Sequence, residues 1–330
     1  MMVITKTPLR ISFFGGGTDY PEWVKRHGGA VLSTSINKYS YLYVQRLSPF
    51  FPYKTKVVWS RIEEVNDVNE IAHPSVRETL RFMNFNSGVS IHYNGDVPAR
   101  SGVGSSSSFT VGLLHALYGL NGITPDKKKL AEEAIHIEQN CIKENVGFQD
   151  QIASAFGGFN KIEFKKDGGF EVLPIIISEE KIRDLEDHMM LFFTGFSRTA
   201  SEIVVEQIKN IPKKEKDLHL MRDMVDEAVS LLDNGGPDWL GDFGKLLNKS
   251  WKLKRGLSSK VSTDIIDGFY NRAMEAGALG GKLLGAGGGG FLLIYARPEN
   301  HGLIKKALSN LLYVPFIFEK EGSRIIYRTD

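Results

Sequence analysis

The chain has 330 residues, of which 42% are hydrophobic and 24% are charged, as is typical of one large globular domain or two closely packed ones. Its formal net charge of +2 at pH 7 gives no sign of the positive field of a nucleic-acid-binding protein. The single cysteine, Cys141, excludes an internal disulfide and a cysteine-based zinc site.

In chain order, strand patterns come first, and helical patterns follow a Gly/Ser-rich turn at residues 95–108. Before this turn we expect strands at 2–6, 9–14, 30–33, 39–46, 56–59 and 89–93, and a helix at 75–83. After it we expect helices at 106–118, 125–143 and 149–156, and strands at 159–164, 170–176 and 189–193.

The remainder is helical from 197 to 254, with a break at 234–237. It continues with a helix at 263–276, a glycine-rich segment, a strand at 291–295, a helix at 299–308 and strands near 313–318 and 324–327. This order predicts an α+β protein in two parts. The sequence shows no signal peptide and no run long enough to span a bilayer, so we expect a cytoplasmic protein without a membrane partner.

The turn at 95–108 indicates a phosphate site. A strand pattern leads into the turn and a helical pattern follows directly. The turn can therefore present several backbone N–H groups to an anion, and the positive end of the helix dipole behind them favours the same negative charge. Two other matches are misleading. Residues 285–290 spell the dinucleotide fingerprint but open into a strand, and Asp242-Phe243-Gly244 lacks the other protein-kinase motifs. There is no P-loop sequence, and the histidines lack metal-ligand spacing.

Three further segments carry candidate chemistry. Residues 8–20 form a strand with Arg10, three glycines and then Asp19. Asp150 begins a short apolar helix, where an acid can also serve only the helix dipole. Residues 280–290 contain seven glycines in eleven positions, which suggests backbone packed closely against another element or a ligand.

Together these segments resemble the GHMP kinases, a superfamily of small-molecule kinases. The family's ATP motif Pro-x3-Gly-Leu-Gly-Ser-Ser-Ala reads here as 98–107, with Val103 for Leu and Ser107 for Ala. The resemblance implies the GHMP kinase fold, with a ribosomal-protein-S5-like N-terminal domain (1–190), a ferredoxin-like C-terminal domain (191–330) and the active site between them. Thr18-Asp19-Tyr20 resembles the sugar kinases, and the missing Glu-His pair argues against galactose.

Segments 7–19, 28–38, 194–202 and 281–291 are similar to bacterial D-glycero-D-manno-heptose 7-phosphate kinases. That branch implies ATP-dependent phosphorylation of the anomeric C1 hydroxyl to the 1,7-bisphosphate. Two alternatives stay open. One is another sugar 1-kinase, for free heptose, fucose or a related hexose, and the other is an inactive ligand sensor. The sequence leaves the oligomeric state open.

The resemblance also implies residue roles. Asp150 would accept the hydroxyl proton, with Arg10 holding it ionised, and Mg²⁺ would bind Ser106, or Ser105 instead, together with Glu138. ATP would contact Pro98, Arg100, Ser101, Gly102, Val103, Gly104, Ser105, Ser106 and Ser107. The sugar would contact Gly16, Gly17, Thr18, Asp19, Asp150, Gly287 and Gly288. For the 7-phosphate the first candidate is Arg198, and the others are Arg100, Lys38 and Lys282.

Overall fold

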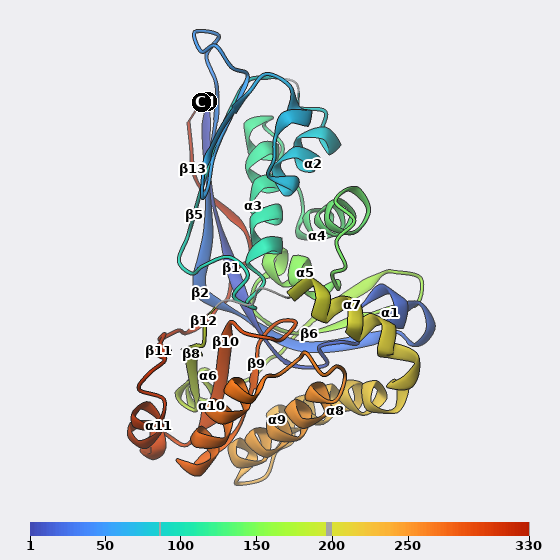
Figure 1. Cartoon of the computed structure of the whole chain (residues 1–330), viewed down its shortest axis with the longest axis vertical. Coiled ribbons are helices and arrows are strands. Elements are labelled where there is room, and N and C mark those ends of the chain that lie inside the picture. Colours follow the sequence, from blue (N-terminus) through green and yellow to red (C-terminus); the bar gives the residue numbers. More distant parts are fainter. Residues whose placement is uncertain (86, 196–199, 330) are drawn as a thin grey trace.

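The computed structural model describes residues 1–85, 87–195 and 200–329 (Figure 1). Within these ranges the strands form two sheets, one of nine strands and one of four, with helices packed against both. The α+β class expected from the sequence is confirmed. In the described part of the chain no helix is both long and apolar enough to cross a membrane.

The larger sheet has the strand order β13-β1-β2-β5-β3-β4, with β6 and β12 also pairing with β2, and β7 with β6. The long strand β2 pairs antiparallel with each of its partners, whereas β3 and β5 run parallel. These strands are β1 (Met2–Phe14), β2 (Gly29–Arg46), β3 (Thr55–Val58), β4 (Ile62–Val65), β5 (Val89–Gly95), β6 (Phe159–Phe164), β7 (Phe170–Pro174), β12 (Phe318–Glu319) and β13 (Arg324–Arg328).

The strands expected at 2–6 and 9–14 are one continuous strand, and the same holds for 30–33 and 39–46. Proline cannot donate a ladder hydrogen bond, so Pro8 is a position at which regular pairing of β1 is expected to fail. The structure accommodates Pro8 at an irregularity. Pro8 pairs with Tyr39 and Leu9 with Ile36, so two extra residues bulge from β2 at that point.

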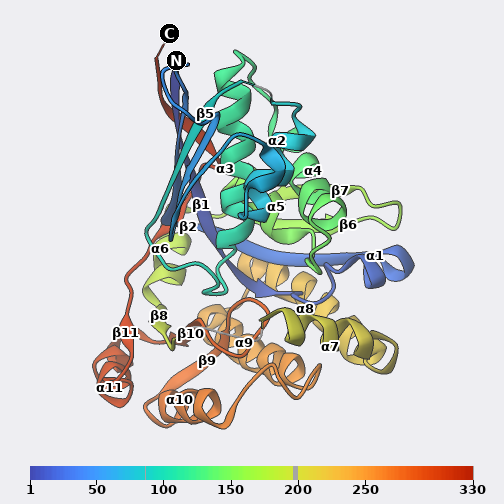
Figure 2. The ribbon, with the colours of Figure 1, turned by 45° about the horizontal axis from the view of Figure 1, so that its top comes forward.

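Helices cover one face of the larger sheet (Figures 1 and 2). The helix α3 lies directly on β1 and β2, and nearly all of its residues are buried. The first part of the chain contains α1 (Pro21–His27), α2 (Pro74–Phe82), α3 (Ser105–Leu120), α4 (Lys127–His136), α5 (Gln149–Phe156) and α6 (Glu179–Asp187). The helix expected at 125–143 is α4 followed by a π-helix at Ile137–Cys141.

The smaller sheet has the order β11-β8-β10-β9, with β8 (Met189–Phe193), β9 (Ala278–Leu283), β10 (Phe291–Ala296) and β11 (Leu312–Tyr313). Its part of the chain contains α7 (Ala200–Asn210), α8 (Glu215–Asn234), α9 (Trp239–Arg255), α10 (Asp264–Glu275) and α11 (His301–Ala307). One apolar core joins the two parts, since Ile11 of β1 belongs to the same cluster as Val225 of α8 and Leu293 of β10.

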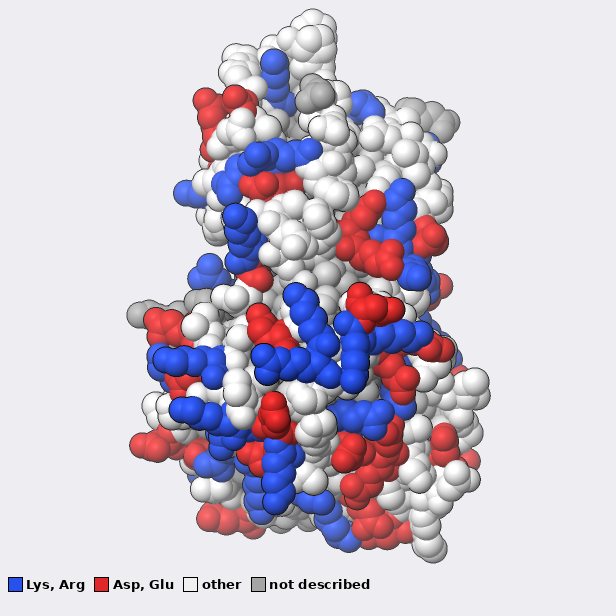
Figure 3. All heavy atoms as spheres, turned by 90° about the vertical axis from the view of Figure 1, so that its right-hand side faces the viewer, with Lys and Arg blue, Asp and Glu red and all other residues white. Residues whose placement is uncertain are grey.

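The chain returns to the larger sheet at its C-terminal end, where β12 pairs with β2 and β13 with β1. The division of the sequence at residue 190 stays a prediction. On the face drawn in Figure 3, basic and acidic side chains are interspersed.

Candidate active site

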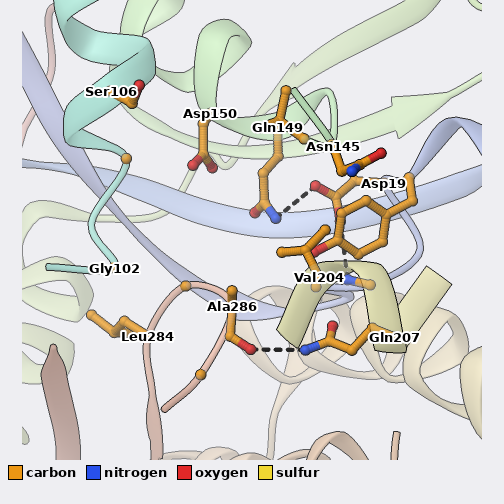
Figure 4. A pocket seen from close by; sticks show the side chains of 18 of the residues that line it. Asp19, Gly102, Ser106, Asn145, Gln149, Asp150, Val204, Gln207, Leu284 and Ala286 are labelled. Carbon is orange, nitrogen blue, oxygen red and sulfur yellow. Dashed lines mark hydrogen bonds between the residues drawn. The ribbon is translucent and has the colours of Figure 1, made fainter. Parts of the chain in front are cut away.

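A cavity of about 560 Å³ is lined by residues from both parts of the fold. Its walls are the turn after β1, the N-terminus of α3, the segment before α5, the helix α7 and the glycine-rich turn between β9 and β10 (Figure 4). The phosphate turn and the three further segments singled out in the sequence all contribute residues to this wall.

Arg10 and Asp150 form a bidentate salt bridge at this cavity. Arg10 Nε lies 2.8 Å from Asp150 Oδ1, and Arg10 Nη2 lies 2.9 Å from Oδ2. Nη1 of the same guanidinium donates to the Gly102 carbonyl oxygen at 2.7 Å. Arg10 is only 3% exposed. Its bidentate contact fixes the orientation of the Asp150 carboxylate, and its bond to Gly102 connects that carboxylate to the turn before α3.

That turn has the geometry of an anion site. Gly104 is the N-cap of α3 and has a left-handed backbone with φ 77°, so the first N–H groups of the helix have no side-chain cap. Of the predicted ATP contacts, five line the cavity: Arg100, Gly102, Gly104, Ser105 and Ser106.

The other four predicted ATP contacts do not line the cavity. Ser101 Oγ donates to the Pro98 carbonyl oxygen at 2.7 Å, and the Val103 carbonyl oxygen accepts from Arg10 N at 3.0 Å. Ser107 Oγ donates to Glu138 Oε2 at 2.8 Å. These residues therefore support the turn from behind.

Glu138 is fully buried on the π-helix and is not part of the cavity wall. It accepts hydrogen bonds from Ser107 and from Gln151 Nε2, at 2.5 Å, while its Oε1 has no partner among the described residues. Burial raises the pKa of this carboxyl to about 7. A buried carboxylate oxygen without a partner, next to the serines of the turn, fits the oxygen ligands that Mg²⁺ prefers.

Asp19 faces the cavity from the turn after β1. It accepts from Gly17 N at 3.0 Å and from Gln149 Nε2 at 2.8 Å (Figure 4). Burial raises the pKa of Asp19, and the charge of Asp150 adds to the effect. Gln149 Oε1 has no partner in the described part of the chain. Asp19 and Gln149 together can therefore accept and donate hydrogen bonds to a polyhydroxylated ligand.

Some of the other predicted sugar contacts line the cavity and others do not. Gly16, Gly17 and Gly287 line the cavity. Thr18 faces inward and donates to the carbonyl oxygens of Gly15 and Ala30, so it holds the turn together. Gly288 is absent from the cavity wall, and its N–H donates to the Val261 carbonyl oxygen.

Of the predicted phosphate-binding cations, Arg100 lines the cavity, whereas Lys38 and Lys282 do not. Lys282 is buried and donates to the Phe13 carbonyl oxygen at 2.8 Å. Arg198 lies outside the described residues.

Several cavity residues were not expected from the sequence, among them Asn145, Gln149, Gln207 and Lys254. Lys254 was hidden in the basic run at the end of α9, which is typical of a solvated helix face. The helical period contained the missing information, because Lys254 lies on the same face as the buried Leu247 and Trp251.

Comparisons with known proteins agree with this fold. The family model "GHMP kinases N terminal domain" matches residues 69–158, and "GHMP kinases C terminal" matches 238–314. The chain is 30% identical to the D-glycero-alpha-D-manno-heptose 7-phosphate kinase of Campylobacter jejuni over 96% of this chain and 97% of the relative. It is 25% identical to the L-fucokinase/L-fucose-1-P guanylyltransferase of Bacteroides fragilis, over 92% of this chain and 36% of that protein.

Among solved structures, a D-glycero-D-manno-heptose 1-phosphate kinase from Bacteroides thetaiotaomicron superimposes with a TM-score of 0.81, at 22% identity and with all of both chains covered. The chain therefore belongs to the GHMP kinases, and the GHMP kinase fold expected from the motifs is confirmed. Within that family it is an ATP-dependent carbohydrate kinase.

Proposed function

We propose that the protein transfers the γ-phosphoryl group of ATP to the C1 hydroxyl of D-glycero-D-manno-heptose 7-phosphate, which gives the 1,7-bisphosphate. The observation that carries the proposal is the Arg10–Asp150 pair, which lies in one cavity with the N-terminus of α3 and Asp19. The similarity to a heptose 7-phosphate kinase over nearly the whole chain supports the choice of acceptor.

In this proposal Asp150 accepts the proton of the attacking hydroxyl. General-base assistance of this kind contributes about 10²–10⁴ in rate. Arg10 orients the carboxylate and supplies positive charge, while the N–H groups of residues 102–107 hold the β- and γ-phosphates. Ser106 and Glu138 would hold Mg²⁺, which when bound neutralises phosphate charge. Ser106 is exposed at the first turn of α3, which favours it over the buried Ser105.

Asp19 and Gln149 bind hydroxyls of the sugar, because their polar atoms face the same cavity. Arg100 is the predicted phosphate-binding cation that lines this cavity, so it is the described residue we assign to the 7-phosphate. Arg198 stays a prediction, and so does the cytoplasmic location.

A second candidate is a kinase for an unphosphorylated sugar such as fucose or free heptose. The similarity to a protein with L-fucokinase in its name favours this alternative within the same reaction class. The alternative of an inactive ligand sensor is set aside, because this chain is a carbohydrate kinase of the GHMP family and has the Arg10–Asp150 pair.

An ADP-release assay with Mg-ATP and a panel of sugars tests the proposal. The panel contains heptose 7-phosphate, free mannoheptose, mannose, fucose and galactose, and phosphorus NMR locates the new ester. We expect turnover of heptose 7-phosphate with a new C1 ester, and an Asp150→Asn variant about 10²–10⁴-fold slower. Asp233→Asn, at an exposed position at the end of α8, is the control. Preference for a free sugar would support the second candidate, and wild-type turnover by Asp150→Asn would refute the assignment of the base.

A further inference from the structure

Lys254 is a buried cation that has no role in the mechanism proposed above. It reaches the cavity from α9 with only 5% of its surface exposed. In the described part of the chain, its ammonium group donates to the Gly285 carbonyl oxygen at 2.6 Å and has no carboxylate within ion-pair distance. Burying an ammonium group with no carboxylate in direct contact costs free energy, so its retention in a cavity wall suggests an anionic ligand.

The anchor of Lys254 lies against the phosphate turn. A Cβ added at Gly285 would lie 2.6 Å from Gly102 Cα, so the two backbones are in contact. Gly102 is also the residue whose carbonyl oxygen accepts from Arg10 Nη1. Arg10 and Lys254, which come from different parts of the fold, therefore donate to two backbone segments that contact each other beside the N-terminus of α3.

The other side of Lys254 faces the acceptor end of the cavity. A Cβ added at Gly16, in the turn that leads to Asp19, would lie 3.9 Å from Lys254 Nζ. Lys254 therefore lies between the turn that presents N–H groups to phosphates and the turn that carries Asp19. With ATP and the sugar placed as proposed above, a phosphoryl group moving from nucleotide to acceptor would cross this region.

We propose that Lys254 is a catalytic residue whose ammonium group contacts the phosphoryl group during its transfer. The bond between the γ-phosphorus and the oxygen that bridges it to the β-phosphate breaks, and the bond to the acceptor oxygen forms. The acceptor proton goes to Asp150, and Lys254 keeps its own proton throughout. The inference rests on the position proposed above for ATP, but not on the identity of the sugar.

The charges around Lys254 make the proposal sensitive to pH. The groups that face it are Arg10 of β1, Asp19 of the following turn, Asp150 of α5 and Lys282 of β9. Burial, with a contribution from Arg10, lowers the pKa of Lys254 to about 8. Above that pH the free enzyme loses the charge that the transition state needs.

The decisive variant is Lys254→Met, and the matched control is Lys252→Met, an exposed position on the same helix. The probes are Mg-ADP alone and Mg-ADP with aluminium fluoride, which mimics the phosphoryl group in transfer. We expect Lys254→Met to lower kcat and the affinity for the fluoride complex by about 100-fold, while the affinity for Mg-ADP changes less than about 3-fold. The control should match the wild type.

Equal weakening of both complexes, or none, would overturn the proposal. So would an effect confined to the KM of heptose 7-phosphate, because Lys254 would then bind the acceptor's phosphate. The nucleotide measurements need no acceptor, so they remain informative if no sugar of the panel is phosphorylated.

Two readouts separate this role from a structural one. Lys254→Met should keep or raise the melting temperature, because it removes a buried unpaired charge. Lys254→Arg should retain part of the activity and lose the fall in kcat/KM that the wild type shows above about pH 8. If Lys254→Met does not fold, this pH profile decides, and an unchanged fall in Lys254→Arg refutes the role.

Discussion

Two glycine-rich turns meet at the cavity, and they offer opposite hydrogen-bonding groups. The turn before α3 ends in a helix N-terminus, so it presents N–H donors. The turn between β9 and β10 presents carbonyl oxygens, which accept from Lys254 at Gly285, from Gln207 at Ala286 and from Thr194 at Gly290. The difference shows that glycine content alone does not reveal what a turn binds. The element that follows the turn decides it.

The largest expected effect concerns the contact between the two turns. In Gly285→Ala the new Cβ would lie 2.6 Å from Gly102 Cα at a residue with φ +72°. Overpacking and left-handed strain together should lower the free energy of unfolding by about 3 kcal/mol. Urea unfolding measures it. A loss below about 1 kcal/mol would mean that the turns are not held against each other as described.

Next comes the donor turn, where a substitution should affect chemistry more than stability. In Gly104→Ala the added Cβ would lie 3.3 Å from Arg10 Cγ and 3.5 Å from Asp150 Cγ, which are side-chain atoms that can move. We expect kcat to fall by about 10–100-fold because the catalytic pair shifts, with only about 1 kcal/mol of destabilisation. Steady-state kinetics with matched unfolding curves checks this. A variant with normal kcat but low stability would contradict the prediction, because this turn would then matter for stability and not for catalysis.

The donor turn also has a buried acid behind it, and this gives it a pH dependence. Burial raises the pKa of Glu138 to about 7, above its value in the unfolded chain, so its contribution to stability is present at low pH and is lost as the pH rises through 7. Glu138→Gln should therefore be about 1–2 kcal/mol more stable than the wild type at pH 8 and equal to it near pH 4. The activity of Glu138→Gln should fall because the substitution removes the proposed carboxylate ligand of Mg²⁺.

Unfolding measured from pH 4 to pH 8 tests the Glu138 prediction, with the exposed Glu132→Gln on α4 as the control. A stability difference that does not change with pH would contradict it.

The smallest effect is expected far from both turns. Gly168 has φ +89°, but a Cβ there would have nothing within 4 Å. Gly168→Ala should therefore show backbone strain alone, about 1 kcal/mol, with unchanged kinetics. A loss as large as that of Gly285→Ala would show that strain, not contact, explains the first prediction.

The sequence predicted those parts of the site that depend on local order. The phosphate turn before α3 follows from a strand pattern, glycines and serines, and a helical pattern read in succession. Arg10 and Asp150 were assigned by resemblance, and their distances follow from the pairing of segments 140 residues apart, which no periodicity shows.

Tertiary contacts explain what was missed. The period of α9 placed Lys254 on a buried face, but only the fold brings that face to a cavity. Ser101, Val103 and Ser107 fit the ATP motif, yet their side chains point into the protein. The helices α1 and α6 are short and were not expected, because few apolar residues mark them.

The π-helix at Ile137–Cys141 has a further consequence. Its hydrogen bond from Ile142 N to the Ile137 carbonyl oxygen spans five residues, so this segment contains one residue more than an α-helix would over the same turn. Deleting Asn140 would restore the α-helical register and rotate Glu138 by about 100° relative to the segment that leads to Asp150. The orientation of Glu138 relative to the chain that continues to Asp150 therefore depends on this π-helical turn.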